Sequence, residues 1–227
     1  MPARRSAREI LDHTNLSSVE LKLFFDDLDL VNRRWGNVRT LARRLRPALL
    51  ASDGSSWIIL DVGAGAATMS GRLVEKLRRA RAPIFRVALD RNWHHLMVGR
   101  TLSGREALAA VAADAFRLPL PDGSADWIVS TLFFHHFSPE ENVRLLKELA
   151  RVARRGLALL DIRRGYVPLL FLSTIGRISC KSRFAFEDGI TSVRQSYTAA
   201  EARAIASAAL PGARVERVFP CRLMISL

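Results

Sequence analysis

Short apolar runs alternate with amphipathic stretches along most of the 227 residues. The runs lie at residues 58–61, 84–90, 111–114, 127–132 and 157–162, and three of them end in an acidic residue. Between them, apolar residues recur at steps of three and four, which predicts helices over residues 69–79 and after Ser138. Strands that alternate with helices favour an α/β fold with a doubly wound sheet.

Another apolar pattern precedes the first predicted strand. From Leu21 to Leu49 the apolar residues follow a helical spacing, which Gly36 interrupts. Ser17 and Glu20 have the spacing of a capping box, a signature of a helix start. We therefore expect an N-terminal helical extension over residues 1–52 and a main domain over residues 53–227. The apolar stripe is interpreted either as core packing or as the inner face of a lid.

The first strand runs into a glycine-containing loop with the sequence Asp61-Val62-Gly63-Ala64-Gly65. Glycines adopt backbone angles closed to other residues and let main-chain N–H groups approach a bound cofactor. A dinucleotide fingerprint would need a third glycine at position 68, where the chain has Thr68. A Gly-x-Gly-x-Gly loop is also incomplete, because Ala67 occupies its third place. The loop alone does not indicate which cofactor binds.

Two more acidic residues follow predicted strands. Asp90 ends the second strand at about the spacing at which a doubly wound fold presents a carboxylate to a ribose diol. Asp114 ends the third run and is followed by a block with the sequence AFRLPLPDGSADWIVS.

This block, together with FFHHF and LLKELARVARRG further along, resembles class I S-adenosylmethionine (SAM)-dependent methyltransferases that act on small molecules. The resemblance covers residues 57–162 and implies a Rossmann-like, seven-stranded sheet, with residues 215–218 and 222–227 as its closing antiparallel pair. It also implies SAM as the cofactor and S-adenosylhomocysteine as the product. Two departures from the family are Ala67 and the sequence Arg154-Arg155-Gly156, where relatives usually have a Pro-Gly-Gly turn.

The resemblance assigns cofactor contacts to residues of this chain. Asp61 and the glycine loop would lie against the methionine part of SAM, Asp90 would hold the ribose hydroxyls, and Asp114 would border the adenine. The complete set of expected cofactor residues is Asp61, Gly63, Ala64, Gly65, Asp90, Arg91, Asp114, Ala115, Phe116 and Thr131.

His135 and His136 follow the fourth strand, at the sheet edge where α/β proteins bind ligands. Methyl transfer to a hydroxyl needs alignment and a base, and a histidine with an ordinary pKa of ~6.5 suits that role. His136 is the first candidate for the base and His135 the second. Asp161, at the end of the fifth strand, would orient the ring or act as a further base. A structural role for the histidine pair stays open.

Residues 163–187 form an apolar-basic insertion. An apolar stretch between cationic flanks is too short to span a bilayer, so it either lies at a membrane interface or caps an apolar substrate pocket. Together with residues 188–201 it resembles methyltransferases found beside type III polyketide synthases. That resemblance points to O-methylation of a phenolic, polyketide or quinone-like acceptor.

The formal net charge of +13 leaves room for an anionic partner. Arginines far outnumber lysines, with 31 against 4, which a GC-rich coding sequence also produces. The charge keeps a nucleic-acid methyltransferase as an alternative. The incomplete glycine loop keeps a non-catalytic SAM-binding accessory protein as another, and an NAD-dependent oxidoreductase ranks below both. The Asn/Asp-Pro-Pro-aromatic motif of base-modifying enzymes is missing after the fourth strand, where the chain has Leu132-Phe133-Phe134-His135-His136.

Two cysteines are too few for a disulfide framework or a metal cluster, and we expect no metal cofactor. The basic residues at the start lead into no apolar signal core, and no run approaches a membrane span. We expect a cytoplasmic protein, with membrane contact through residues 163–187 as a hypothesis. The pattern gives no oligomeric state.

Overall fold

The computed structural model describes residues 2–5, 7, 9–13, 16–78, 82–102, 108–176 and 180–227. Its centre is a seven-stranded sheet with the order β3-β2-β1-β4-β5-β7-β6. The first five strands are parallel, and β7 runs antiparallel to both of its neighbours. The α/β prediction and the closing antiparallel pair are confirmed. The strands are β1 Trp57–Val62, β2 Ile84–Asp90, β3 Ala109–Ala112, β4 Ala125–Thr131, β5 Ala153–Ile162, β6 Arg214–Val218 and β7 Arg222–Ser226.

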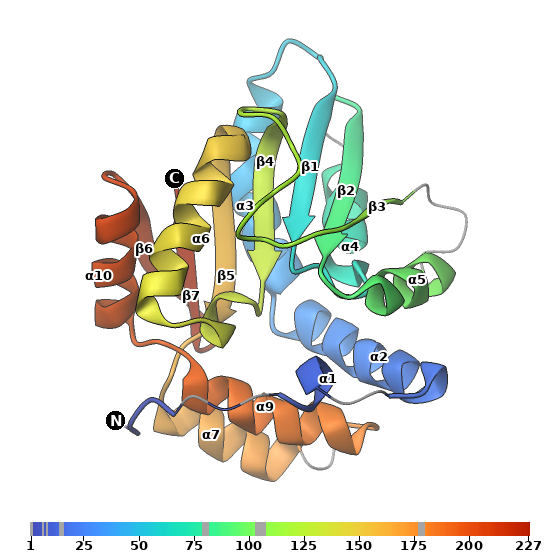
Figure 1. The fold of residues 1–227 in the computed structure, drawn as a ribbon, viewed down its shortest axis with the longest axis vertical. Helices are drawn as coiled ribbons and strands as arrows, with labels where there is room; N and C mark the ends of the chain where they lie inside the picture. Colours follow the sequence, from blue (N-terminus) through green and yellow to red (C-terminus); the bar gives the residue numbers. More distant parts are fainter. Residues whose placement is uncertain are drawn as a thin grey trace.

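Helices cover both faces of the sheet and one of its ends (Figure 1). The helices α6 and α10 lie on one face, and α3 and α4 lie on the other. Several more gather beyond the carboxyl ends of the strands, where they form a helical cap (Figure 1). The flanking helices are α3 Asn37–Leu50, α4 Thr68–Leu77, α5 Trp93–Leu102, α6 Pro139–Val152 and α10 Ala199–Ala209; the cap holds α1 Ile10–His13, α2 Ser18–Arg34, α7 Tyr166–Phe171, the wider turn Leu172–Gly176 and α9 Arg183–Gln195.

The helix starts follow the predicted capping chemistry. Ser17 and Glu20 form a complete capping box at α2, and Ser138 and Glu141 form another at α6. A third capping box begins α10 at Thr198. Between α2 and α3, Gly36 takes a left-handed backbone with φ of 74°, which only glycine adopts without strain. The predicted break in the N-terminal stripe is therefore confirmed.

The two helices that carry the N-terminal apolar stripe fit different interpretations of it. In α3, Leu41, Leu45 and Leu49 are buried in a cluster that also contains residues of β1, α4 and β4. In α2, Phe24 and Phe25 bury their rings against the loop after β1, over the carboxyl ends of the strands. Thus α3 is core packing, and α2 covers the edge of the sheet where ligands bind. The division of the chain at residue 52 stays a prediction.

Two predicted boundaries are wrong by a few residues. The third strand is Ala109–Ala112 and ends before Asp114, because its pairing with β2 stops at Asp90. The helix before β5 ends at Val152, so residues 154–156 are already strand. There Arg154 and Arg155 bind Asp126 at 3.3 and 3.1 Å. Gly156 has no room for a side chain, since a Cβ would lie 2.5 Å from the carbonyl oxygen of Leu227.

The insertion predicted at residues 163–187 contains α7, the turn after it and the start of α9, and residues 177–179 lie outside the described part. Among all the residues that the structure describes, no helix is both long and apolar enough to cross a membrane.

Candidate active site

A cavity of about 800 Å³ lies between the helical cap and the carboxyl ends of the strands. Its walls come from α2, the loops after β1, β2 and β4, the insertion and α9. A smaller cleft of about 110 Å³ lies between the loops after β1, β2, β3 and β4. Gly63, Asp90, Arg91 and Phe133 line both spaces, so the two are continuous parts of one site.

The loop after β1 depends on left-handed backbone at three positions. Gly63 has φ of 67°, and a Cβ there would lie 2.4 Å from the ring of Phe133. Gly65 has φ of 54°, and its N–H donates to Asp90 Oδ2 at 2.8 Å. Ala67 is also left-handed, with φ of 53°, and it is buried. A left-handed L-residue costs roughly 1–2 kcal/mol, and this alanine stands in the third place of the Gly-x-Gly-x-Gly pattern.

Asp90 connects the loop to the second strand. One carboxylate oxygen accepts the N–H of Gly65, and the other accepts the N–H of Asn92 at 2.8 Å. The side chain still lines both spaces. Asp90 therefore fixes the glycine loop and presents a carboxylate at the surface of the cavity, where a ribose diol would bind.

The smaller cleft contains the residues expected at the adenine. Asp114, Ala115 and Phe116 line it together with Phe133 and Phe137. The ring of Phe137 packs edge-on against Phe116 at 5.0 Å and against Phe133 at 4.8 Å. An aromatic slot with carboxylates at its edge has the chemistry that an adenosine group requires, so the residues present fit the cofactor.

Other expected cofactor residues divide between the surface of the cavity and the interior. Ala64, Gly65, Arg91 and Thr131 line the large cavity. Asp61 does not line it, because its carboxyl group lies beneath the loop with 1% of the residue exposed. Burial raises the pKa of Asp61 to about 7, although Ser70 and Arg86 oppose the rise. Among the residues that the structure describes, none forms a hydrogen bond with its buried Oδ2.

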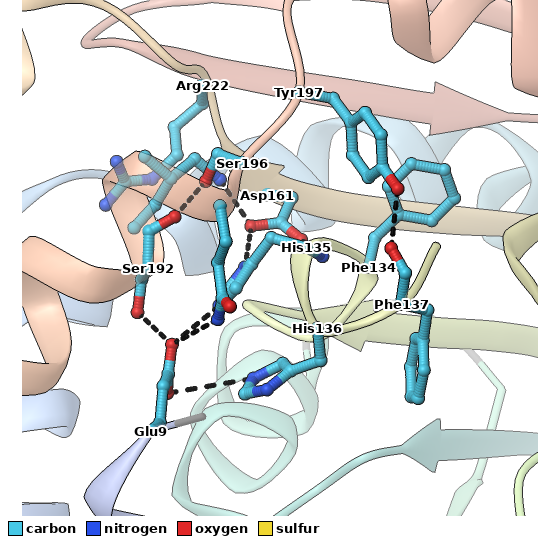
Figure 2. Close-up of polar contacts among 12 residues, drawn as sticks. Glu9, Phe134, His135, His136, Phe137, Asp161, Ser192, Ser196, Tyr197 and Arg222 are labelled. Atoms are coloured by element: carbon cyan, nitrogen blue, oxygen red, sulfur yellow. Dashed lines mark hydrogen bonds and ion pairs between the residues drawn. The ribbon is translucent and has the colours of Figure 1, made fainter. Parts of the chain in front are cut away.

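His135 is held between two buried carboxylates (Figure 2). Its Nδ1 lies 2.6 Å from Asp161 Oδ1, and its Nε2 lies 3.2 Å from Glu9 Oε1. Burial disfavours the charged ring, but the charge and hydrogen bond of Asp161 and those of Glu9 raise the pKa of His135 to about 10. Both carboxylates have lowered pKa values for the same reason. The ring is therefore an imidazolium at neutral pH and has no lone pair with which to act as a base.

His136 occupies a different environment on the next residue. Its Nδ1 lies 3.2 Å from Asp12 Oδ2, and its Nε2 lies 3.8 Å from Glu9 Oε2. The ring stacks on His135 with centroids 4.4 Å apart, remains partly exposed and lines the large cavity. Of the three predicted catalytic residues, His135 and His136 reach the cavity and Asp161 does not. Both oxygens of Asp161 are occupied by His135 and by the N–H of Ile162.

Glu9, His135 and His136 bring ligand atoms to within 4.8 Å of one another, a spacing that a metal ion could bridge. The hydrogen bond between His135 and Glu9 occupies the same atoms. Ser192 and Gln195 also donate to Glu9 Oε1. The donor set is thus already satisfied as an ion-pair network.

The sequence pattern did not indicate Glu9 and Asp12 as site residues. They reach the site because the backbone N–H groups of Ile10 and Leu11 donate to Asp188 in α9, at 2.7 and 3.0 Å. Arg4 adds a hydrogen bond to the carbonyl of Phe137 at 2.8 Å. The only signal in the sequence is a pair of acids within a basic segment, and it gives no indication of partners more than 120 residues away.

Known proteins share part of this sequence pattern and this fold. Residues 60–160 match the family model described as a methyltransferase domain. No curated protein sequence matches the chain.

Solved structures give the same fold at low identity. A SAM-dependent methyltransferase from Aquifex aeolicus is 19% identical with a TM-score of 0.60, over 93% of this chain and 98% of that one. A magnesium protoporphyrin IX methyltransferase from Synechocystis, with bound S-adenosylhomocysteine, is 15% identical with a TM-score of 0.55, over 84% and 82%. The CMeT domain of citrinin polyketide synthase is 16% identical with a TM-score of 0.62, over 84% and 52%.

Replacement of Asp90 tests the cofactor site. Asp90→Asn keeps the size of the side chain but removes the charge that would accept the ribose hydroxyls, so we expect SAM binding to weaken by ~1–3 kcal/mol. Titration calorimetry measures this affinity, and Asp26→Asn on the exposed face of α2 serves as the matched control. Unchanged affinity in Asp90→Asn would remove the ribose assignment.

The His135 ion pairs make stability depend on pH with a defined sign. The ring has a pKa of ~6.5 when unfolded and about 10 when folded. The stabilisation is therefore fully present below pH ~6.5 and is lost as pH rises toward 10.

We expect the Tm of the wild-type protein to fall between pH 6.5 and 10 by at least ~3 °C more than that of His135→Asn, the shift that ~1 kcal/mol produces in a domain of this size. Thermal unfolding followed by circular dichroism measures it, with His94→Asn on the exposed part of α5 as the control. Parallel pH profiles for wild type and His135→Asn would contradict a buried imidazolium.

Proposed function

We propose that this chain, a SAM-dependent methyltransferase by its domain match and its fold, transfers a methyl group to a hydroxyl of an apolar small molecule, with a phenolic oxygen as the acceptor. The observation that carries the proposal is the apolar cavity of about 800 Å³, which is continuous with the cofactor loop and has His136 in its wall.

The walls of the cavity support an apolar acceptor. Leu28 and Val31 of α2 and Trp35 directly after it form one side, and Pro168 and Leu172 of the insertion form another. Carboxylates and cations also line the cavity, so its apolar walls would select the body of the ligand by shape and by the removal of water. The volume and lining favour an aromatic or alkyl-aromatic molecule over a nucleic-acid chain.

The residues of this chain align the acceptor and accept its proton. SAM supplies a methyl group on a sulfonium, which is already a good leaving group, so the demand on the protein is an in-line approach and a base. In the proposal, Asp12 accepts a hydrogen bond from Nδ1–H of His136, which leaves Nε2 to take the proton of the acceptor. The imidazolium that forms is then stabilised by the carboxylates of Asp12 and Glu9.

His135 and Asp161 have a different role in this proposal from the one the sequence suggested. His135 is already protonated, and Asp161 is occupied in holding it. We assign both to positioning: their ion pair holds the loop after β4 that carries His136.

His136→Ala should reduce turnover ~100-fold or more if His136 is the base, with little change in the affinity for SAM. Release of S-adenosylhomocysteine with 4-hexylphenol as the acceptor measures turnover, and calorimetry measures SAM binding. His94→Ala is the matched control, since it removes an exposed histidine from α5. Turnover that survives in His136→Ala would show that alignment alone carries the reaction.

The outer face of α7 supports the peripheral membrane contact as part of the proposal. Val167 and Leu170 are 68% and 67% exposed, while Pro168 and Leu172 face the cavity from the same segment. An apolar acceptor dissolved in an anionic bilayer would then enter beside α7, and the net charge of +13 favours such a surface. The proposal therefore includes a cytoplasmic enzyme that works at a membrane surface.

Val167→Asp with Leu170→Asp should reduce binding to vesicles of phosphatidylglycerol and phosphatidylcholine at least ~10-fold, because each inserted side chain contributes roughly 1.5–3 kcal/mol. Co-sedimentation measures the bound fraction. Val19→Asp, at an exposed apolar position of α2, is the control. Equal binding by all three proteins, or none by wild type, would exclude α7 as a membrane contact.

A further inference from the structure

Arg222 is a buried cation that the methyl-transfer scheme does not use. It is the first residue of β7, pairs with Ile162 at the end of β5, and is 2% exposed. It also lines the large cavity, next to Trp35, the residue that follows α2. In the view of Figure 2, Arg222 and His136 lie on different sides of the His135–Asp161 pair.

The partners of Arg222 leave most of its hydrogen-bonding capacity unused. Nε donates to Asn37 Oδ1 at 3.3 Å, and the guanidinium carbon lies 4.8 Å from the centroid of the Trp35 ring. Within the described residues, no carboxylate lies within 4.0 Å of Arg222, and the bond from Nε is the one side-chain hydrogen bond that it makes. A guanidinium has five N–H donors, so four of them remain for a ligand.

The charge at this position is costly without a counter-ion. Burial lowers the pKa of Arg222 to about 10, while the charge of Asp161 opposes that change, so the side chain is still a cation at neutral pH. Asp161 does not neutralise it by contact, because its own oxygens are bound to His135 and to the backbone. A buried, unpaired ion loses several kcal/mol of hydration. Such an arrangement is expected where a ligand supplies the opposite charge.

We propose that Arg222 binds a carboxylate on the methyl acceptor, so that the substrate is an apolar molecule with one acidic group at the end distant from the cofactor. The planar fork of a guanidinium matches a carboxylate in two parallel hydrogen bonds. A phosphate dianion fits less well, because the carboxylates of Glu9, Asp12, Asp27 and Asp188 already line the same cavity and would repel a second negative charge on the ligand. The inference rests on the proposed function, since it names the acceptor of that reaction.

The position in the sheet separates Arg222 from the expected cofactor contacts. Those contacts follow β1, β2, β3 and β4, whereas β7 lies beyond β5 in the strand order. We therefore do not assign the carboxylate of SAM to Arg222. If SAM were its partner, Arg222→Met would weaken SAM binding, which is a separate measurement from acceptor binding.

Equilibrium binding of a matched pair of probes tests the inference without any turnover. The probes are 4-hexylbenzoate and 4-hexylbenzyl alcohol, which share an alkyl-aromatic body and differ in charge. With S-adenosylhomocysteine present, calorimetry on the wild-type protein should give about 10- to 100-fold tighter binding of the benzoate. Arg222→Met should abolish that preference and change the affinity for the alcohol less than about twofold.

Controls separate a built site from general positive charge and from a structural role. Arg33→Met removes an exposed cation of α2 and should keep the preference. The Tm of Arg222→Met without ligand should be unchanged or higher, since the variant removes an uncompensated charge. If Arg222→Met does not fold, Arg222→Lys, which keeps the charge but loses the fork, should reduce the preference.

Four results would overturn the inference: equal affinities of wild type for the two probes, a preference retained in Arg222→Met or in Arg222→Lys, a preference lost equally in Arg33→Met, or SAM binding weakened ~10-fold or more in Arg222→Met. Because none of these readouts needs methyl transfer, failure of His136 as the base would leave the result on Arg222 standing.

Discussion

The helical cap depends on one buried cation, the imidazolium of His135. Asp161 at the end of β5 and Glu9 of the N-terminal segment bind its two nitrogens, and Ser192 and Gln195 of α9 bind the same carboxylate of Glu9. Four parts of the chain that are distant in sequence therefore meet at one ring. In a low-dielectric interior, removing one member of such a network leaves an unpaired charge, so the members stabilise each other strongly. This network joins the N-terminal segment and α9 of the cap to the carboxyl ends of β4 and β5.

The same network positions His136 and leaves its ring in the wall of the cavity. His135 and His136 are adjacent in sequence and stacked in space, but one is enclosed by carboxylates and the other faces the cavity. The difference in environment separates their roles: two carboxylates hold His135 as a cation, and His136 presents its ring to the cavity. Glu9 contributes to both, since one oxygen binds His135 and the other lies near His136.

The cavity combines apolar walls with a few charges that have distinct tasks. Asp90 fixes the glycine loop, Asp12 orients His136, and Arg222 carries a charge without a contacting counter-ion. A buried charge is stable only where an opposite charge or hydrogen bonds compensate it. Charged groups that already have such partners are therefore structural, and those without them are available to a ligand. In the proposed reaction, the cofactor end of the cavity would be defined by the loop after β1, and the acceptor end by Arg222 and the insertion.

Local patterns in the sequence determined the strands, the helix caps and the glycine loop, because each depends on residues within a few positions of one another. Asp61 and Asp90 at strand ends, the box at Ser138 and the break at Gly36 are of this kind. The seven-stranded sheet, its closing antiparallel pair and the expected cofactor residues followed from the family resemblance. The sequence could not show that Asp61 lies beneath the loop, that His135 is an ion rather than a base, or that Glu9, Asp12 and Arg222 belong to the site. These depend on contacts between residues up to 186 positions apart, and on burial that only the packed cap creates.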